Sequence, residues 1–162
     1  MRHAVAFAAI FTMALSPAAW PHGESPGQGK VRKVISTEEK AFGREGDPKR
    51  VSRTVNVDMS DAMRFSPAEL KVKRGETIRF LVKNSGKTMH EMVLGTMQEL
   101  AEHAELMKKH PGMEHDEPYM AHVAPGKAQT VVWQFTKPGE FYYGCLIPGH
   151  FEAGMVGKVI VR

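Results

Sequence analysis

The chain has 162 residues, a formal net charge of +4 and a single cysteine. This length suits one domain with extensions, and a single cysteine excludes an internal disulfide. The charge is unevenly distributed, because eight basic and four acidic residues lie between Lys30 and Arg53 and the rest of the chain is nearly neutral. No nucleic-acid-binding motif or interleaved aromatic pattern accompanies this basic stretch, so we do not expect a nucleic-acid partner.

The first residues have the pattern of a secretory signal. A short basic start precedes the twelve-residue apolar run from Ala4 to Leu15, and small residues follow it up to Ala19. Such a run is too short to span a bilayer as a helix. We therefore expect residues 1–19 to be a signal peptide, cleaved between Ala19 and Gly23, and the product to be periplasmic with no stable membrane insertion. A free thiol in that oxidising compartment is a liability that metal ligation removes.

Residues 20–50 form a polar, basic N-terminal extension with little apolar periodicity. Such a composition is typical of a solvated, partly disordered segment. Docking to an acidic partner is the alternative interpretation. The folded domain is expected to begin at Val51.

From residue 51 onwards, short β-like runs alternate with Gly and Pro breaks. The runs are 51–58, 70–72, 77–84, 91–94, 129–135, 140–144 and 156–162. Alternating apolar and polar residues at period two indicate half-buried strands. Many short strands with regular breaks predict an all-β fold, an antiparallel Greek-key β-sandwich over residues 51–162.

One segment within about 95–124 departs from this rhythm. Residues 96–109 carry Met97, Leu100, Ala104 and Met107 at helical spacing, and Pro111-Gly112 follows them. The spacing predicts an inserted amphipathic helix whose methionines face the core.

The loop after this helix is rich in donors that copper accepts. Met is a good Cu(I) donor, and His serves either oxidation state. An exposed loop has no packing need for methionines, which favours a second copper site. The alternative is an ordinary loop with two methionines tucked under it. The candidate ligands fall within thirteen residues: His110, Met113, His115, Met120 and His122.

The strongest chemical signal is the stretch from Cys145 to Met155. It offers the Cys145 thiolate, the His150 imidazole and the Met155 thioether within eleven residues, between two strand-like runs. A soft thiolate, an imidazole and a weak thioether suit copper that cycles between +1 and +2. A trigonal site needs one more histidine, and His90, at the head of an earlier strand-like run, is the candidate. The alternative is that Cys145 and Met155 are simply buried apolar side chains.

With these residues in view, the chain resembles the cupredoxins, the small blue-copper proteins that include plastocyanin, azurin and auracyanin. The resemblance covers residues 51–162 and rests on the segment from Asn84 to His90 and on the spacing of Cys145, His150 and Met155. More narrowly, the helical insert and its His/Met loop resemble exported cupredoxins linked to bacterial copper tolerance.

The resemblance implies one type 1 copper ion as the cofactor. His90, Cys145 and His150 would be its equatorial ligands, Met155 its axial ligand, and His150 the port for electrons to a redox partner protein. Many cupredoxins carry Asn after the first histidine, where its amide ties the two ligand loops together. Here Glu91 occupies that place, and a carboxylate cannot donate unless it is protonated, so the tie must be made differently.

Three function classes follow. The first is one-electron transfer coupled to periplasmic copper tolerance, in which the His/Met loop would hold an additional Cu(I). The second is a dedicated electron carrier between respiratory or photosynthetic partners, with no role in copper handling. The third, an oxidase-type enzyme, would need a further His-rich copper cluster and more domains. No catalytic acid–base pair or nucleophile motif is visible, so we expect no enzyme activity beyond a conceivable oxidation of cuprous ion.

Overall fold

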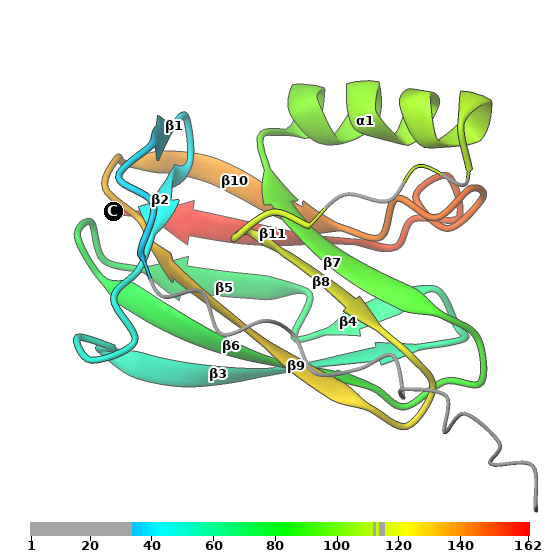
Figure 1. Ribbon diagram of the computed structural model, residues 1–162, viewed down its shortest axis with the longest axis horizontal. Helices are drawn as coiled ribbons and strands as arrows, with labels where there is room; N and C mark the ends of the chain where they lie inside the picture. The colour runs from blue at the N-terminus through cyan, green and yellow to red at the C-terminus, as the bar shows by residue number, and fades with distance from the viewer. Residues whose placement is uncertain (1–33, 112, 114–115) are drawn as a thin grey trace, which may run out of the picture. The chain divides into compact units, whose positions relative to one another are not determined.

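The computed structural model describes residues 34–111, 113 and 116–162, so the expected signal peptide lies outside the described residues. In the described residues the chain forms a series of strands that is interrupted once by a helix, as Figure 1 shows. In order they are β1 (Glu39–Lys40), β2 (Gly43–Glu45), β3 (Arg53–Ser60), β4 (Arg64–Ser66), β5 (Glu69–Val72), β6 (Thr77–Asn84), β7 (His90–Gly95), α1 (Met97–Lys109), β8 (Met120–Val123), β9 (Ala128–Gln134), β10 (Gly139–Gly144) and β11 (Val156–Val161).

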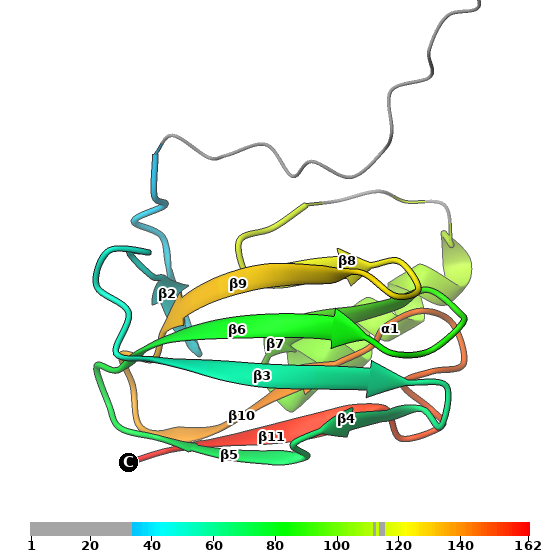
Figure 2. The ribbon, with the colours of Figure 1, turned by 90° about the horizontal axis from the view of Figure 1, so that it is seen from below.

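The strands form two sheets that pack face to face as a sandwich (Figure 2). One sheet has the order β1-β2-β9-β6-β3-β4, and the other has the order β5-β11-β10-β7-β8. The predicted sandwich is confirmed, but the expectation of purely antiparallel pairing is wrong. β3 pairs with β6 in parallel, and β11 pairs with β5 in parallel. After β3 the chain reverses through β4 and crosses to the other sheet as β5. It then returns as β6, which runs in the same direction as β3 and pairs with it.

The core lies between the sheets and follows the alternation of the strands. In β6, Ile78, Phe80 and Val82 point inward and are completely buried. Tyr143 of β10 and Val159 of β11 meet them from the other sheet. Burying such side chains contributes about 1.5–3 kcal/mol each, which makes this core the main source of stability.

The segment before residue 51 is partly folded, contrary to the expectation of a solvated extension. β2 pairs with β9, and Phe42 is 2% exposed. The Phe42 ring stacks on Trp133 at a centroid distance of 5.1 Å, and the Trp133 indole N–H donates to the Phe42 carbonyl at 2.9 Å. One aromatic side chain therefore anchors a segment that is otherwise polar.

The predicted helix is confirmed as α1, and it explains why β7 is buried on both faces. Leu100, Ala104 and Met107 pack onto Val93, which points away from the main core. Met97 was expected to face the core as well, but it is 41% exposed because it occupies the first helical position, beyond the edge of the contact. Figure 1 shows α1 lying across the sheet that contains β7 and β10.

The second half of the predicted His/Met loop is a strand. β8 pairs with β7, so Met120 and His122 belong to the sheet. Within the described residues, no helix combines the length and apolar character needed to cross a membrane.

Candidate metal centre

Side chains from three separated segments converge at one end of the sandwich. His90 is the first residue of β7, Cys145 directly follows β10, and His150 lies in the loop before β11. One potential ligand atom from each lies within 4.8 Å of the others. Among the described residues, this is the one group of three or more His, Cys, Asp or Glu side chains whose donor atoms converge in this way.

The imidazole of His90 has the arrangement that a metal ligand requires. The side chain is fully buried, and its Nδ1 has no hydrogen-bond partner, whereas its Nε2 lies 3.1 Å from the Asp61 carboxylate. A buried polar atom without a partner costs about 1–3 kcal/mol. A bound metal ion would satisfy Nδ1, so the residues present fit copper.

The thiol of Cys145 is equally enclosed. Its Sγ lies 3.3 Å from His150 Nδ1 and accepts the backbone N–H of Glu91 at 3.5 Å. Burial raises the pKa of the Cys145 thiol to about 12, and burial also lowers the pKa of His150, with the neighbouring His90 adding to the effect. A metal that binds here must therefore displace the thiol proton, and the imidazole beside it is already favoured in its neutral, ligating form.

Met155 closes the ligand loop. Its side chain is fully buried, and its backbone accepts from the N–H of Cys145 at 3.1 Å and donates to the carbonyl of His150 at 3.0 Å. These two bonds hold the loop back on itself, so that the last residue lies beside the first. The predicted quartet of His90, Cys145, His150 and Met155 is consistent with a type 1 copper site.

The segment that precedes His90 is held by a buried amide. The side-chain amide of Asn84, at the end of β6, donates to the carbonyls of Thr88 and Val123, both at 2.8 Å. Its Oδ1 accepts the N–H of Gly86 at 2.9 Å. The amide satisfies two backbone groups of the turn, at Gly86 and Thr88, and joins that turn to Val123 at the end of β8. His90 thereby begins β7 at a fixed position.

Glu91 makes the tie between the two ligand segments as an acceptor. Its Oε1 accepts the N–H of Leu146 at 2.8 Å, next to Cys145, and its Oε2 lies 2.9 Å from His122 Nδ1. The carboxylate is 2% exposed, and a buried carboxylate is tolerated when it is paired and hydrogen-bonded. His122 therefore lies beside Glu91 on β8, directly opposite it in the register.

The other candidates for a second copper site lie in different surroundings. His110 is the C-terminal cap of α1, and Met113 is 42% exposed. Met120 is buried in the contact beneath α1, so the argument that these methionines have no packing role does not hold for it. His115 lies outside the described residues.

Two contributors near the site were not predicted, Asp61 of the β3–β4 turn and Arg64, the first residue of β4. Besides Asp61 on His90, the Arg64 guanidinium donates to the carbonyl of Ala153 in the ligand loop at 2.7 Å. Hydrogen bonds from the Lys87 backbone and the Thr88 hydroxyl hold the pKa of Asp61 well below its usual range. Nothing in the sequence marks these residues, because the turn lies about 30 residues before His90 and only the fold brings the two together.

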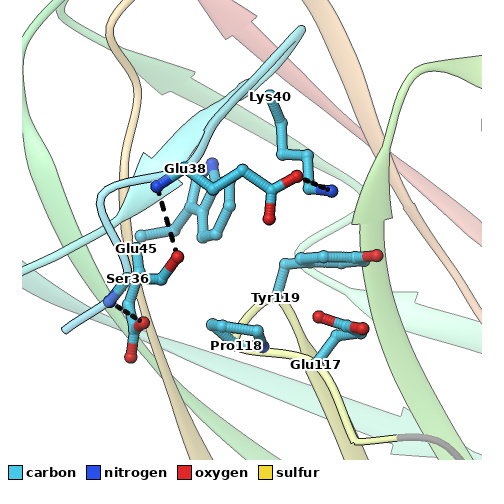
Figure 3. Close-up of a pocket in the computed structure, with 8 residues that line it drawn as sticks. Ser36, Glu38, Lys40, Glu45, Glu117, Pro118 and Tyr119 are labelled. Carbon is cyan, nitrogen blue, oxygen red and sulfur yellow. Dashed lines mark hydrogen bonds and ion pairs between the residues drawn. The ribbon is translucent and has the colours of Figure 1, made fainter. Parts of the chain in front are cut away.

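A shallow pocket of about 70 Å³ lies elsewhere on the molecule (Figure 3). It is lined by Ser36, Glu38, Lys40, Glu45, Glu117, Pro118, Tyr119 and Trp133. Trp133 pairs with Ile78 near the start of β6, whereas the copper ligands gather near the end of that strand, where Asn84 holds the segment before His90. The pocket therefore shares no residue with the metal centre.

Sequence comparison agrees with this site. The family described as "Copper binding proteins, plastocyanin/azurin family" matches residues 51–162, which contain all four predicted ligands. The chain belongs to this family of copper-binding proteins. Among solved structures, reduced auracyanin from Roseiflexus castenholzii superposes with a TM-score of 0.59 at 21% identity, over 69% of this chain and 98% of auracyanin. That similarity supports the cupredoxin fold.

Closer relatives within the family are the copper-resistant cuproproteins called CopI. The CopI of Rubrivivax gelatinosus is 55% identical over 121 residues, which cover 75% of this chain and 73% of the relative. The CopI of Pseudomonas aeruginosa is 35% identical over 151 residues, covering 75% of this chain and 83% of the relative. The chain is therefore a homologue of the CopI cuproproteins.

Proposed function

We propose that this protein is a periplasmic type 1 copper protein that transfers single electrons and protects the cell against excess copper. His90, Cys145 and His150 would hold the ion, with Met155 as the weak axial ligand. The observation that carries the proposal is the convergence of one donor atom each from His90, Cys145 and His150 within 4.8 Å, beside a buried His90 Nδ1 that has no hydrogen-bond partner. When bound in such a donor set, copper supplies reversible one-electron chemistry between Cu(II) and Cu(I).

The protein's own contribution is to hold the donor side chains in fixed positions and to exclude water from them. Cys145 and Met155 are fully buried, and the loop that carries them is joined to itself by backbone hydrogen bonds. Glu91 joins that loop to the strand of His90. Because the ligands move little between oxidation states in such a frame, little reorganisation opposes electron transfer.

Electrons would enter and leave through His150. Its side chain is half-buried, whereas the other donors are fully enclosed. The neighbouring Phe151 is also half-buried and Pro148 is exposed, and we infer that these two residues form an apolar rim beside the imidazole edge. A redox partner protein would dock over this rim.

The link to copper tolerance is supported by the relatives, which are copper-resistant cuproproteins, and by the His/Met donors after α1. The test is a strain that lacks the gene and carries either the wild-type protein or Cys145→Ala. We expect wild type to restore growth on added copper and Cys145→Ala to fail, with both proteins present at equal level in the periplasmic fraction. Full protection by Cys145→Ala would contradict the proposal.

The His/Met segment is a proposed second site for Cu(I). Because Met120 and His122 have structural partners, the informative variant replaces His110 and His115 by Gln and Met113 by Ser. Loss of copper bound beyond one ion per chain, with the type 1 colour intact, would support the site. The matched control is Met97→Ser, which removes a methionine of equal exposure at the other end of α1. Unchanged stoichiometry and tolerance in the triple variant would favour the alternative, a dedicated electron carrier.

A further inference from the structure

The carboxylate of Asp61 is bonded both to a copper ligand and to the segment that carries this ligand. Its Oδ1 lies 3.1 Å from His90 Nε2 and accepts the Thr88 hydroxyl at 2.9 Å. The same carboxylate accepts the backbone N–H of Lys87 at 2.7 Å and that of Thr88 at 3.3 Å. The orientation of the carboxylate is thus fixed by the backbone, and the ring of His90 is aligned to it.

This contact determines which nitrogen of His90 is free to bind a metal. A neutral imidazole carries one N–H, and the hydrogen bond made by one nitrogen sets the state of the other. A carboxylate can only accept, so the proton of His90 must lie on Nε2. Nδ1, which has no hydrogen-bond partner, then carries the lone pair and is the nitrogen of His90 left to join the cluster with Cys145 and His150.

The contact also affects the electronic balance of the site. A carboxylate that accepts from a ligating imidazole raises the basicity of that ligand. A negative charge close to the metal favours the more highly charged ion. Both effects stabilise Cu(II) relative to Cu(I).

The turn that carries Asp61 is shaped for this approach. A Cβ atom at Gly86 would lie 2.2 Å from Asp61 Oδ1 and 3.1 Å from the Asp61 backbone nitrogen, so any side chain there would displace the turn. Three residues further on, Arg64 Nη1 donates to the carbonyl of Ala153 at 2.7 Å. The β3–β4 turn and the first residue of β4 therefore touch both segments that supply the proposed copper ligands.

From this geometry we propose that Asp61 is a positioning residue of the copper centre. It fixes the Nε2–H tautomer of His90 and holds the reduction potential of the bound copper down. The proposal rests on the proposed copper-binding function, but its first consequence, the tautomer, can be measured without copper.

The test uses the full mature protein in three forms: wild type, Asp61→Asn and Asp58→Asn. Asparagine keeps the shape and one acceptor oxygen of Asp61 but removes the charge. Asp58 is the matched control, because it lies on the adjoining strand β3 and bonds to the Ser85 hydroxyl rather than to a ligand. Nitrogen-15 NMR of the copper-free protein gives the tautomer of His90, and redox titration of the copper-loaded protein gives the potential.

We expect the copper-free wild type to carry the His90 proton on Nε2. Asp61→Asn should keep its thiolate-to-copper absorption and shift the preference towards Cu(I) at least tenfold, which is a rise of about 59 mV for a one-electron couple. Asp58→Asn should shift the preference less than threefold.

Three results would overturn the proposal. The first is a proton on Nδ1 of His90 in the copper-free wild type. The second is a preference for Cu(I) in Asp61→Asn that differs less than threefold from that of the wild type. The third is a shift in Asp58→Asn as large as that in Asp61→Asn. If instead the wild type took up copper without any thiolate absorption, the proposed function would fail, while the tautomer measurement would still decide the role of Asp61.

Discussion

At the scale of single residues, the four donors divide into those that hold the metal and one that tunes it. Met155→Leu keeps the volume of a fully buried side chain and removes a weak axial donor, so copper should remain bound. The reduction potential should rise, by on the order of 59 mV for a tenfold gain in relative Cu(I) preference. His90→Ala removes an equatorial donor and leaves a cavity that admits water, so copper should be lost or bound far more weakly. Copper retention on dialysis, with voltammetry, measures both. Equal loss of copper from the two variants would contradict the division.

Glu91 offers a second prediction at this scale, one concerned with stability. Glu91→Ala leaves the Leu146 N–H without an acceptor and His122 without its buried partner. The free energy of unfolding of the copper-free protein in urea should therefore fall by about 1–3 kcal/mol. Glu91→Gln keeps an acceptor for Leu146 and should lose less. Glu140→Ala is the control, because its exposed pair with Lys158 contributes at most about 1 kcal/mol. A Glu91→Ala protein as stable as the control would show that the tie has no energetic role.

At the scale of elements, α1 covers the outer face of β7 and reaches the ligand loop. Its N-terminus is closed by a capping box in which Thr96 and Glu99 exchange hydrogen bonds, and Lys108 near its end forms an ion pair with Glu152 of the ligand loop at 2.6 Å. Removing the cap by Thr96→Ala should cost about 1 kcal/mol. Gln98→Ala, on the exposed face of the same turn, should cost less than about half of that. Thermal unfolding by circular dichroism compares the two variants, and equal stability would argue against the cap.

Also at this scale, the sequence predicts the strands that have a clear local periodicity and misses those that lack it. β6 and β9 alternate cleanly, and the sequence predicts both to within one residue at either end. β8 was missed because Met120, His122 and their neighbours suggest metal donors as readily as a strand, and the pairing with β7 that buries Met120 is a long-range contact. β2 was missed because a single aromatic residue, Phe42, anchors a polar stretch.

At the scale of the whole molecule, the candidate ligands could be read from local sequence, whereas the residues that support them depend on long-range contacts. Three of the four candidate ligands could be proposed from the sequence because thiolate, imidazole and thioether at fixed spacing carry a chemical signature within eleven residues, and the fourth, His90, heads an earlier strand-like run. Their supports could not, because Asp61 meets His90, and His122 meets Glu91, across distances in sequence that only the folded sandwich closes. A carboxylate in a turn has no distinguishing pattern until the ring that it orients is beside it.

The central claim is that one copper ion is bound through the thiolate of Cys145, and one measurement tests it most directly. It is the copper content per chain together with the visible absorption spectrum of the copper-loaded protein, for wild type and Cys145→Ala. We predict one tightly bound copper and an intense thiolate-to-Cu(II) band in wild type, bleached by a mild reductant and restored by an oxidant. The band should be absent in Cys145→Ala, because the chain has no other cysteine. A Cys145→Ala protein that kept the band, or a wild type that bound copper without it, would contradict the account.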